Sequence, residues 1–150
     1  MFYLGLRLKE GKGTPKNESE AAEWYRRAAE MGNTNGMVNL GAAYEKGEGV
    51  PQDEAQAIQW YQKAADQASP VGMYNLGVAY ERGEGVPQDG TQAVYWYRQA
   101  AEAGDTDGMV NLGVLLRDGL GTPKDESEAI RWLRRAVEAG HLRVPLHEHR

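Results

Sequence analysis

The four tryptophans of this 150-residue chain are evenly spaced, and no other feature limits the possible folds as strongly. They lie 36 residues apart, at Trp24, Trp60, Trp96 and Trp132. An alanine stands three residues before each of them, and another stands four residues after. A fixed period of this length is typical of a solenoid, in which each repeat buries its apolar face only by stacking on its neighbours.

Each repeat is predicted to contain two helices, which we call A and B. Helix A of the second repeat is expected to begin after Asn33, whose equivalents are Ser69 and Asp105. All three residue types accept hydrogen bonds from the free amides of a first helical turn. Pro70 falls at the first helical position, where its missing amide does no harm. Gly47 is expected to end the helix, because glycine readily takes the left-handed conformation of a C-cap.

The start of helix B is predicted in every repeat from Asp or Asn followed three residues later by Glu or Gln, the pattern of a capping box. The pairs are Asn17 with Glu20, Asp53 with Gln56, Asp89 with Gln92, and Asp125 with Glu128. The helix is expected to end near Gly32, Ala68, Gly104 and Gly140.

One glycine lies inside helix A, at Gly41 and its equivalents, although a glycine there costs about 1 kcal/mol relative to alanine. We expect helix B to approach closely at this point, with the ring of Tyr61 occupying the space that a side chain at position 41 would need.

The pattern predicts an all-α solenoid of four 36-residue helix-turn-helix repeats with about eight helices. The repeats are placed at about 1–33, 34–69, 70–105 and 106–140. Residues 141–150 are expected to form a C-terminal cap or tail, because Pro145 falls inside the next expected helix A. The alternative is that the array is a fragment of a longer one.

The segment from Leu76 to Ala101 follows the pattern LGxxYexGxGVPqDxxqAxxWYxxAA and resembles the Sel1-like repeat, a relative of the tetratricopeptide repeat. The resemblance extends over the chain as far as Gly140. It implies a right-handed superhelix of antiparallel helix pairs, with the A helices lining a concave face. It also implies an adaptor or scaffold role in protein complexes, often in bacteria.

The departures from this family pattern are small. Gly36, Gly72 and Gly108 stand where the family usually has alanine, and Leu116 and Leu133 replace tyrosines of other repeats. Some disulfide-rich members of the family are linked to β-lactam binding. This chain contains no cysteine, so that activity is not carried over.

Composition narrows the classes of partner. The net charge is −5 and the basic residues are scattered, which argues against nucleic acid, whose phosphates require clustered Lys and Arg. No stretch approaches the ~18 apolar residues of a membrane span. Residues 1–8 stand in phase with the repeat and no small-residue cleavage site follows, so they are not interpreted as a signal peptide. A cytoplasmic location is favoured, and the periplasm is left open.

Catalytic constellations are not evident in the sequence, and no cofactor is expected. The three histidines, His141, His147 and His149, all lie in the last ten residues. The His-Glu-His sequence at 147–149 is a weak candidate for metal chelation. The recurring GEGVP segment follows a helix and lacks the Lys-Ser/Thr of a phosphate-binding loop, so it is interpreted as a turn.

The candidate partner-binding residues are apolar positions of helix A that point away from the buried leucine. They are Phe2 and Leu6, Val38 and Ala42, Tyr74 and Val78, and Val110 and Val114, with Arg82 and Arg117 among the charged residues at their edge. A contiguous exposed apolar strip usually marks an interaction site. The alternative is that these residues close against one another or against the B helices.

Asn39, Asn75 and Asn111 occur in register in three A helices, although asparagine is an indifferent helix former. In tetratricopeptide domains that bind extended peptides, an asparagine at this place holds the ligand backbone as donor and acceptor together, and the resemblance implies the same role here. The alternative is that each asparagine bridges adjacent repeats or loop carbonyls.

The leading functional prediction is a non-enzymatic adaptor or scaffold that binds a protein or peptide segment on the concave face. The first alternative is homo-oligomerisation through that face or through the ends of the array. A β-lactamase-like hydrolase is a remote alternative.

Overall fold

The computed structural model describes residues 15–140, which form seven helices and no strand. The helices are α2 (Pro15–Glu30), α3 (Thr34–Lys46), α4 (Glu54–Asp66), α5 (Pro70–Arg82), α6 (Gly90–Glu102), α7 (Thr106–Asp118) and α8 (Glu126–Glu138). The A helices are α3, α5 and α7, and the B helices are α2, α4, α6 and α8. The expected first helix A and the expected cap at 141–150 lie outside the described residues, as do Phe2 and Leu6.

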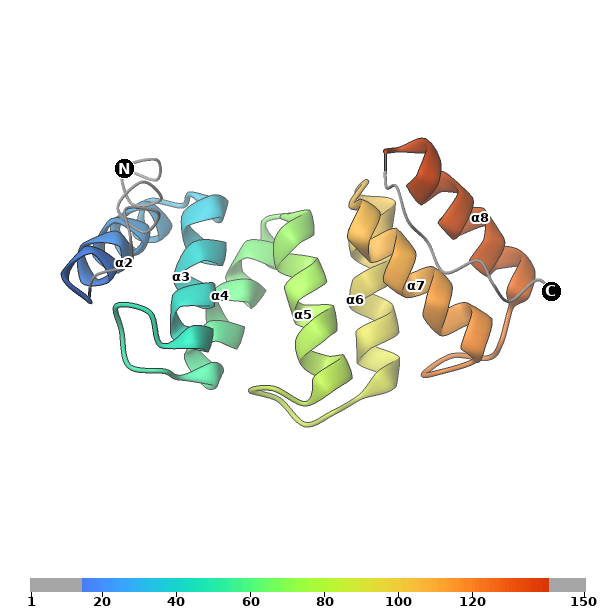
Figure 1. The fold of residues 1–150 in the computed structure, drawn as a ribbon, viewed down its shortest axis with the longest axis horizontal. Coiled ribbons are helices and arrows are strands. Elements are labelled where there is room, and N and C mark those ends of the chain that lie inside the picture. The colour runs from blue at the N-terminus through green and yellow to red at the C-terminus, as the bar shows by residue number, and fades with distance from the viewer. Residues whose placement is uncertain (1–14, 141–150) are drawn as a thin grey trace.

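The helices follow one another as pairs in an open array, with α2 and α8 at opposite ends (Figure 1). Each helix packs on the helix before it and the helix after it in the chain, and α3 and α5 also contact each other. This arrangement confirms the predicted helical solenoid.

The predicted ends of the A helices are confirmed. Asn33 accepts a hydrogen bond from the Gly36 amide at 2.8 Å, and Ser69 and Asp105 cap α5 and α7 in the same way. Pro70 is the first residue of α5. Gly47 ends α3 in the left-handed region at φ 71°, a backbone conformation that costs glycine little.

The predicted capping boxes are only half formed. Asp53 accepts a hydrogen bond from the Gln56 amide at 3.1 Å, but the Asp53 amide donates to the Tyr44 carbonyl at 2.8 Å rather than to the Gln56 side chain. Asp89 and Asp125 cap α6 and α8 and donate in the same way, to the carbonyls of Tyr80 and Leu116. A backbone carbonyl of the preceding helix A therefore accepts the hydrogen bond from the N-cap amide, in place of the Gln or Glu side chain of a capping box.

The N-cap predicted at Asn17 is wrong. Helix α2 begins at Pro15, which places Asn17 inside its first turn. A proline suits a first helical position because its ring fixes φ near the helical value and its missing amide needs no partner. The prolines at the same register in the later repeats lie before their helices.

The core consists of several clusters along the array. Leu40, Leu76 and Leu112 are fully buried. Trp60 packs against the cluster that contains Leu40, and Trp96 packs against the cluster that contains Leu76. Each of these two tryptophans thus packs its own helix B against the cluster that contains the buried leucine of the same repeat.

Two glycines of helix A permit the close approach of its two neighbours. A Cβ atom at Gly41 would lie 2.7 Å from Cε1 of Tyr61, which confirms the predicted contact with the following helix B. A Cβ atom at Gly36 would lie 2.7 Å from Cβ of Ala28 on the preceding helix B. Close packing against Ala28 therefore requires glycine at position 36, where the family usually has alanine.

Candidate functional site

The sequence-predicted partner-binding residues of the described chain all lie on the three A helices, and we call the surface they form the A face. Val38, Asn39 and Ala42 lie on α3, Tyr74, Asn75, Val78 and Arg82 lie on α5, and Val110, Asn111, Val114 and Arg117 lie on α7. Arg82 is exposed and the other ten are half-buried.

The apolar residues of the A face are neither sealed in the core nor fully exposed. Val38 packs against the cores of the second and third repeats, and Tyr74, Val78 and Val110 pack against the core of the last repeats. Each nevertheless keeps part of its surface in solvent. The A face is therefore continuous with the core and still offers apolar contact.

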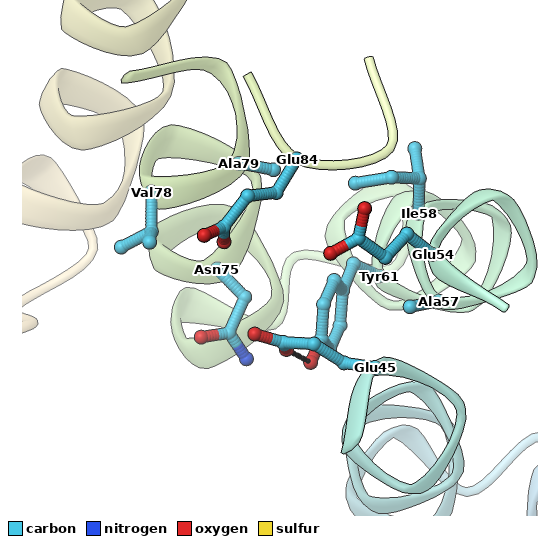
Figure 2. A pocket seen from close by; sticks show the side chains of 9 residues that line it. All are labelled: Glu45, Glu54, Ala57, Ile58, Tyr61, Asn75, Val78, Ala79 and Glu84. Carbon is cyan, nitrogen blue, oxygen red and sulfur yellow. Dashed lines mark hydrogen bonds between the residues drawn. The ribbon is translucent and has the colours of Figure 1, made fainter. Parts of the chain in front are cut away.

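A pocket opens in the A face where α3, α4 and α5 meet. It has a volume of about 310 Å³, including space open to solvent. Asn75 and Val78 line it from α5, and Ile58 and Tyr61 line it from α4. Three glutamates complete the lining: Glu45, Glu54 and Glu84. Figure 2 shows the carboxylates of Glu54 and Glu84 facing one another, with Glu45 and the Asn75 amide beside them.

A smaller pocket of about 220 Å³, including space open to solvent, repeats part of this arrangement one repeat earlier, with two of the three glutamates conserved in register. Its lining residues stand 36 positions before those of the first pocket: Glu18, Ala21, Tyr25, Asn39, Ala43 and Glu48. At the corresponding place between α6 and α7, the two outer glutamates are replaced by Gly90 and Leu120. The A face therefore carries acidic pockets at two successive junctions and changes character at the third.

Sequence reasoning missed the acidic lining of these pockets. Glu54 follows an N-cap and Glu84 lies in a turn, so both resemble ordinary solvated acids. Their recurrence with the repeat period, at Glu18 and Glu48, is the signal that identifies them.

The structure separates the three asparagines that the sequence placed in register. The Asn39 and Asn75 side chains border the two pockets and have no hydrogen-bond partner within residues 15–140. The amide of Asn111 instead interacts with the hydroxyls of Tyr74 and Tyr97. Burial raises the pKa of both hydroxyls, and hydrogen bonding with Asn111 opposes the rise. Asn111 therefore has partners across repeats, whereas Asn39 and Asn75 keep donor and acceptor available.

Two buried tyrosines of the B helices form hydrogen bonds with glutamates of the A helices. The Tyr61 hydroxyl donates to the Glu45 carboxylate at 2.6 Å, and the Tyr97 hydroxyl donates to Glu81 at 2.5 Å. Burial, together with the neighbouring carboxylate, raises the pKa of each tyrosine far above its usual range. Both hydroxyls therefore remain protonated and act as donors.

The edge of the A face carries the two predicted arginines in different settings. The Arg117 Nε atom lies 2.9 Å from the Asp118 carboxylate, whereas Arg82 is exposed at the end of α5.

Residues 15–140 contain no group of three or more His, Cys, Asp or Glu side chains arranged to hold a metal ion. The His-Glu-His sequence at 147–149 lies outside the described residues. Within 15–140, no helix is both long and apolar enough to span a membrane.

Comparisons with known proteins agree with this geometry. The Sel1 repeat family matches four consecutive segments, residues 1–33, 34–69, 70–105 and 106–141. No curated protein matches the sequence. A protective antigen of uropathogenic Escherichia coli with an SLR fold superposes at a TM-score of 0.85 with 43% identity, over 93% of this chain and 30% of that one.

Two further solved structures are similar. A Sel1 repeat protein from Oxalobacter formigenes gives a TM-score of 0.83 at 33% identity, over 92% of this chain and 56% of that one. Cysteine-rich protein B of Helicobacter pylori gives 0.68 at 27% identity, over 87% and 93%. The chain thus spans less than two thirds of the length of the first two relatives.

Sel1 repeat proteins generally act as scaffolds for protein interactions, on a repeat fold that is not itself catalytic. The family match runs through all four repeats, and the helix pairs have the architecture of the solved relatives. This chain belongs to the Sel1 repeat family.

Proposed function

We propose that this chain is a non-enzymatic adaptor or scaffold that binds an extended peptide or protein segment along the A face. The observation that carries the proposal is the pair of asparagine side chains, Asn39 and Asn75, that border pockets one repeat apart and have no partner within residues 15–140. An amide side chain presents one donor group and one acceptor group, which match the C=O and N–H of an extended backbone.

The surroundings of these asparagines support the same function. Val38 and Val78 lie close by on the same helices and are half-exposed, so apolar side chains of a bound segment would gain contact area there. The helices that carry them are held rigidly by fully buried leucines. A surface that is already in place loses little conformational freedom on binding, which favours affinity.

The test is selection of peptides from a random phage-displayed library against the immobilised protein. We expect the wild-type protein to enrich peptides, and expect the double variant Asn39→Ala, Asn75→Ala to lose them while its melting temperature stays near that of the wild type. Asn111→Ala is the matched control for fold, because Asn111 interacts with Tyr74 and Tyr97 and its loss is expected to lower the melting temperature. If the asparagine double variant binds selected peptides as well as the wild type does, the proposed role of these amides is wrong.

A further inference from the structure

We propose that the pocket between α3, α4 and α5 receives a lysine or arginine side chain of the bound segment, so that the A face selects basic peptides. This inference rests on the proposed function and specifies its partner.

The charge of the pocket is not neutralised within the described chain. Glu54 and Glu84 have no ion-pair partner in residues 15–140, and neither Lys nor Arg contributes to the pocket lining. Glu45 is held in place by the Tyr61 hydroxyl at 2.6 Å, a neutral donor that leaves its charge intact. A cation placed beside these carboxylates gains electrostatic attraction, most strongly from the half-buried Glu45 and Glu84 and less from Glu54, which is exposed to solvent.

The shape and the apolar walls of the pocket favour a long side chain with a charged end. Ile58 and Val78 line the pocket together with the glutamates. Lysine and arginine bury their methylene stems along apolar surface while the charged group stays in a polar environment. The space that the pocket encloses is about 30 Å³, and it opens to solvent. This is far smaller than the roughly 300–1,000 Å³ that usually encloses a small-molecule ligand, so the pocket suits the charged end of one side chain.

The arrangement of polar groups around the pocket is suited to a peptide. Asn75 lies on the same side of the pocket as Glu84 and beside Glu45, with Glu54 across from it, so one residue of a bound segment would place its backbone at the amide and its side chain between the glutamates (Figure 2).

Comparison of the junctions within the chain predicts where the preference applies. The earlier pocket has Glu18, Glu48 and Asn39 at equivalent positions, but Lys9 stands at the position equivalent to Glu45, so the basic preference is assigned to the pocket between α3, α4 and α5 alone. At the later junction Gly90 and Leu120 remove both outer carboxylates, and the exposed Leu120 side chain favours apolar residues instead. A selected peptide is therefore expected to be basic toward one end and apolar toward the other.

The experiment uses the same phage-displayed library and sequences the enriched peptides. We expect lysine and arginine to be enriched with the wild-type protein, and expect the double variant Glu54→Gln, Glu84→Gln to lose that enrichment. The matched control is Glu102→Gln, Glu138→Gln, which removes two exposed carboxylates at the ends of α6 and α8 and is expected to keep it.

A selected lysine peptide then allows the affinity to be measured by fluorescence anisotropy. Because ion pairs at solvent-accessible carboxylates are weak, we expect roughly two- to tenfold weakening with the Glu54→Gln, Glu84→Gln variant. Replacing the peptide lysine by norleucine keeps the stem, removes the charge and should weaken binding to the wild type similarly. Higher salt should also weaken the wild-type complex.

The outcomes distinguish this inference from the proposed function. Enriched peptides that lack an excess of lysine and arginine, or equal affinity for the wild type and the glutamine variant, would overturn the basic selectivity and leave peptide binding intact. If no peptide is enriched, the proposed function fails, and this inference fails with it.

Discussion

Gly77 offers the most direct test of how the helices pack. A Cβ atom at this position would lie 2.6 Å from both Cδ1 and Cε1 of Tyr97, which is closer than such atoms approach in proteins. The ring cannot easily move away. Tyr97 is fully buried, and its hydroxyl donates a hydrogen bond to Glu81. The centroid of its ring lies 5.7 Å from the centroid of the Tyr74 ring.

The substitution Gly77→Ala sets two effects against each other. Forcing an extra carbon into a filled core costs about 1–3 kcal/mol. Alanine is a better helix former than glycine, and this recovers about 1 kcal/mol. The steric cost is expected to exceed the gain because the contacting atoms belong to a rigid, anchored ring. We therefore expect a net loss of up to about 2 kcal/mol in the free energy of unfolding.

Urea unfolding followed by far-UV circular dichroism measures this loss, and the Tyr97→Ala background provides the control. Without the ring the methyl group has room, so Gly77→Ala should be neutral or stabilising in that background. The reasoning is refuted if Gly77→Ala alone is as stable as the wild type. It is equally refuted if the loss persists when the Tyr97 ring is absent.

Three further substitutions test other parts of the structure. Leu76→Ala empties a fully buried site and should lower the free energy of unfolding by about 2–5 kcal/mol in the same urea assay. Ala68 has φ 65°, where glycine stands in the other repeats, so Ala68→Gly should raise the melting temperature, with a gain of up to about 1 kcal/mol. Glu128 accepts a hydrogen bond from Arg98, which lowers the Glu128 pKa below its ordinary value of 4.5 in the folded state. The stabilisation is therefore complete above about pH 4.5 and is lost as the pH falls through the folded pKa, so Glu128→Gln should destabilise at pH 7 and converge with the wild type in acid.

The repeat period made much of the fold predictable. The caps at Asn33 and Gly47 and the contact between Gly41 and Tyr61 all follow from local rules applied in the register that the tryptophan spacing sets. The start of α2 was not predictable from the same rules, because Asn17 occupies the register of a cap whereas the first repeat lets the helix begin at Pro15.

Less of the candidate site could be predicted from the sequence, because the repeat register shows which positions are equivalent but does not show which side chains surround each of them. Asn75 and Asn111 are equivalent by position, yet only Asn111 lies against Tyr74 and Tyr97. The acidic pocket depends on Glu45, at the end of one helix A, meeting residues of the next two helices. That convergence arises from three elements in space, and no single segment of the sequence contains it.

The restriction of helix packing almost entirely to neighbours along the chain has an evolutionary consequence. Exchanging one hairpin for a variant with other lining residues alters one section of the A face and leaves the packing of distant hairpins unchanged, because sites without shared contacts behave additively. If the A face binds as proposed, its recognition is modular, and selection is able to change it one ligand position at a time.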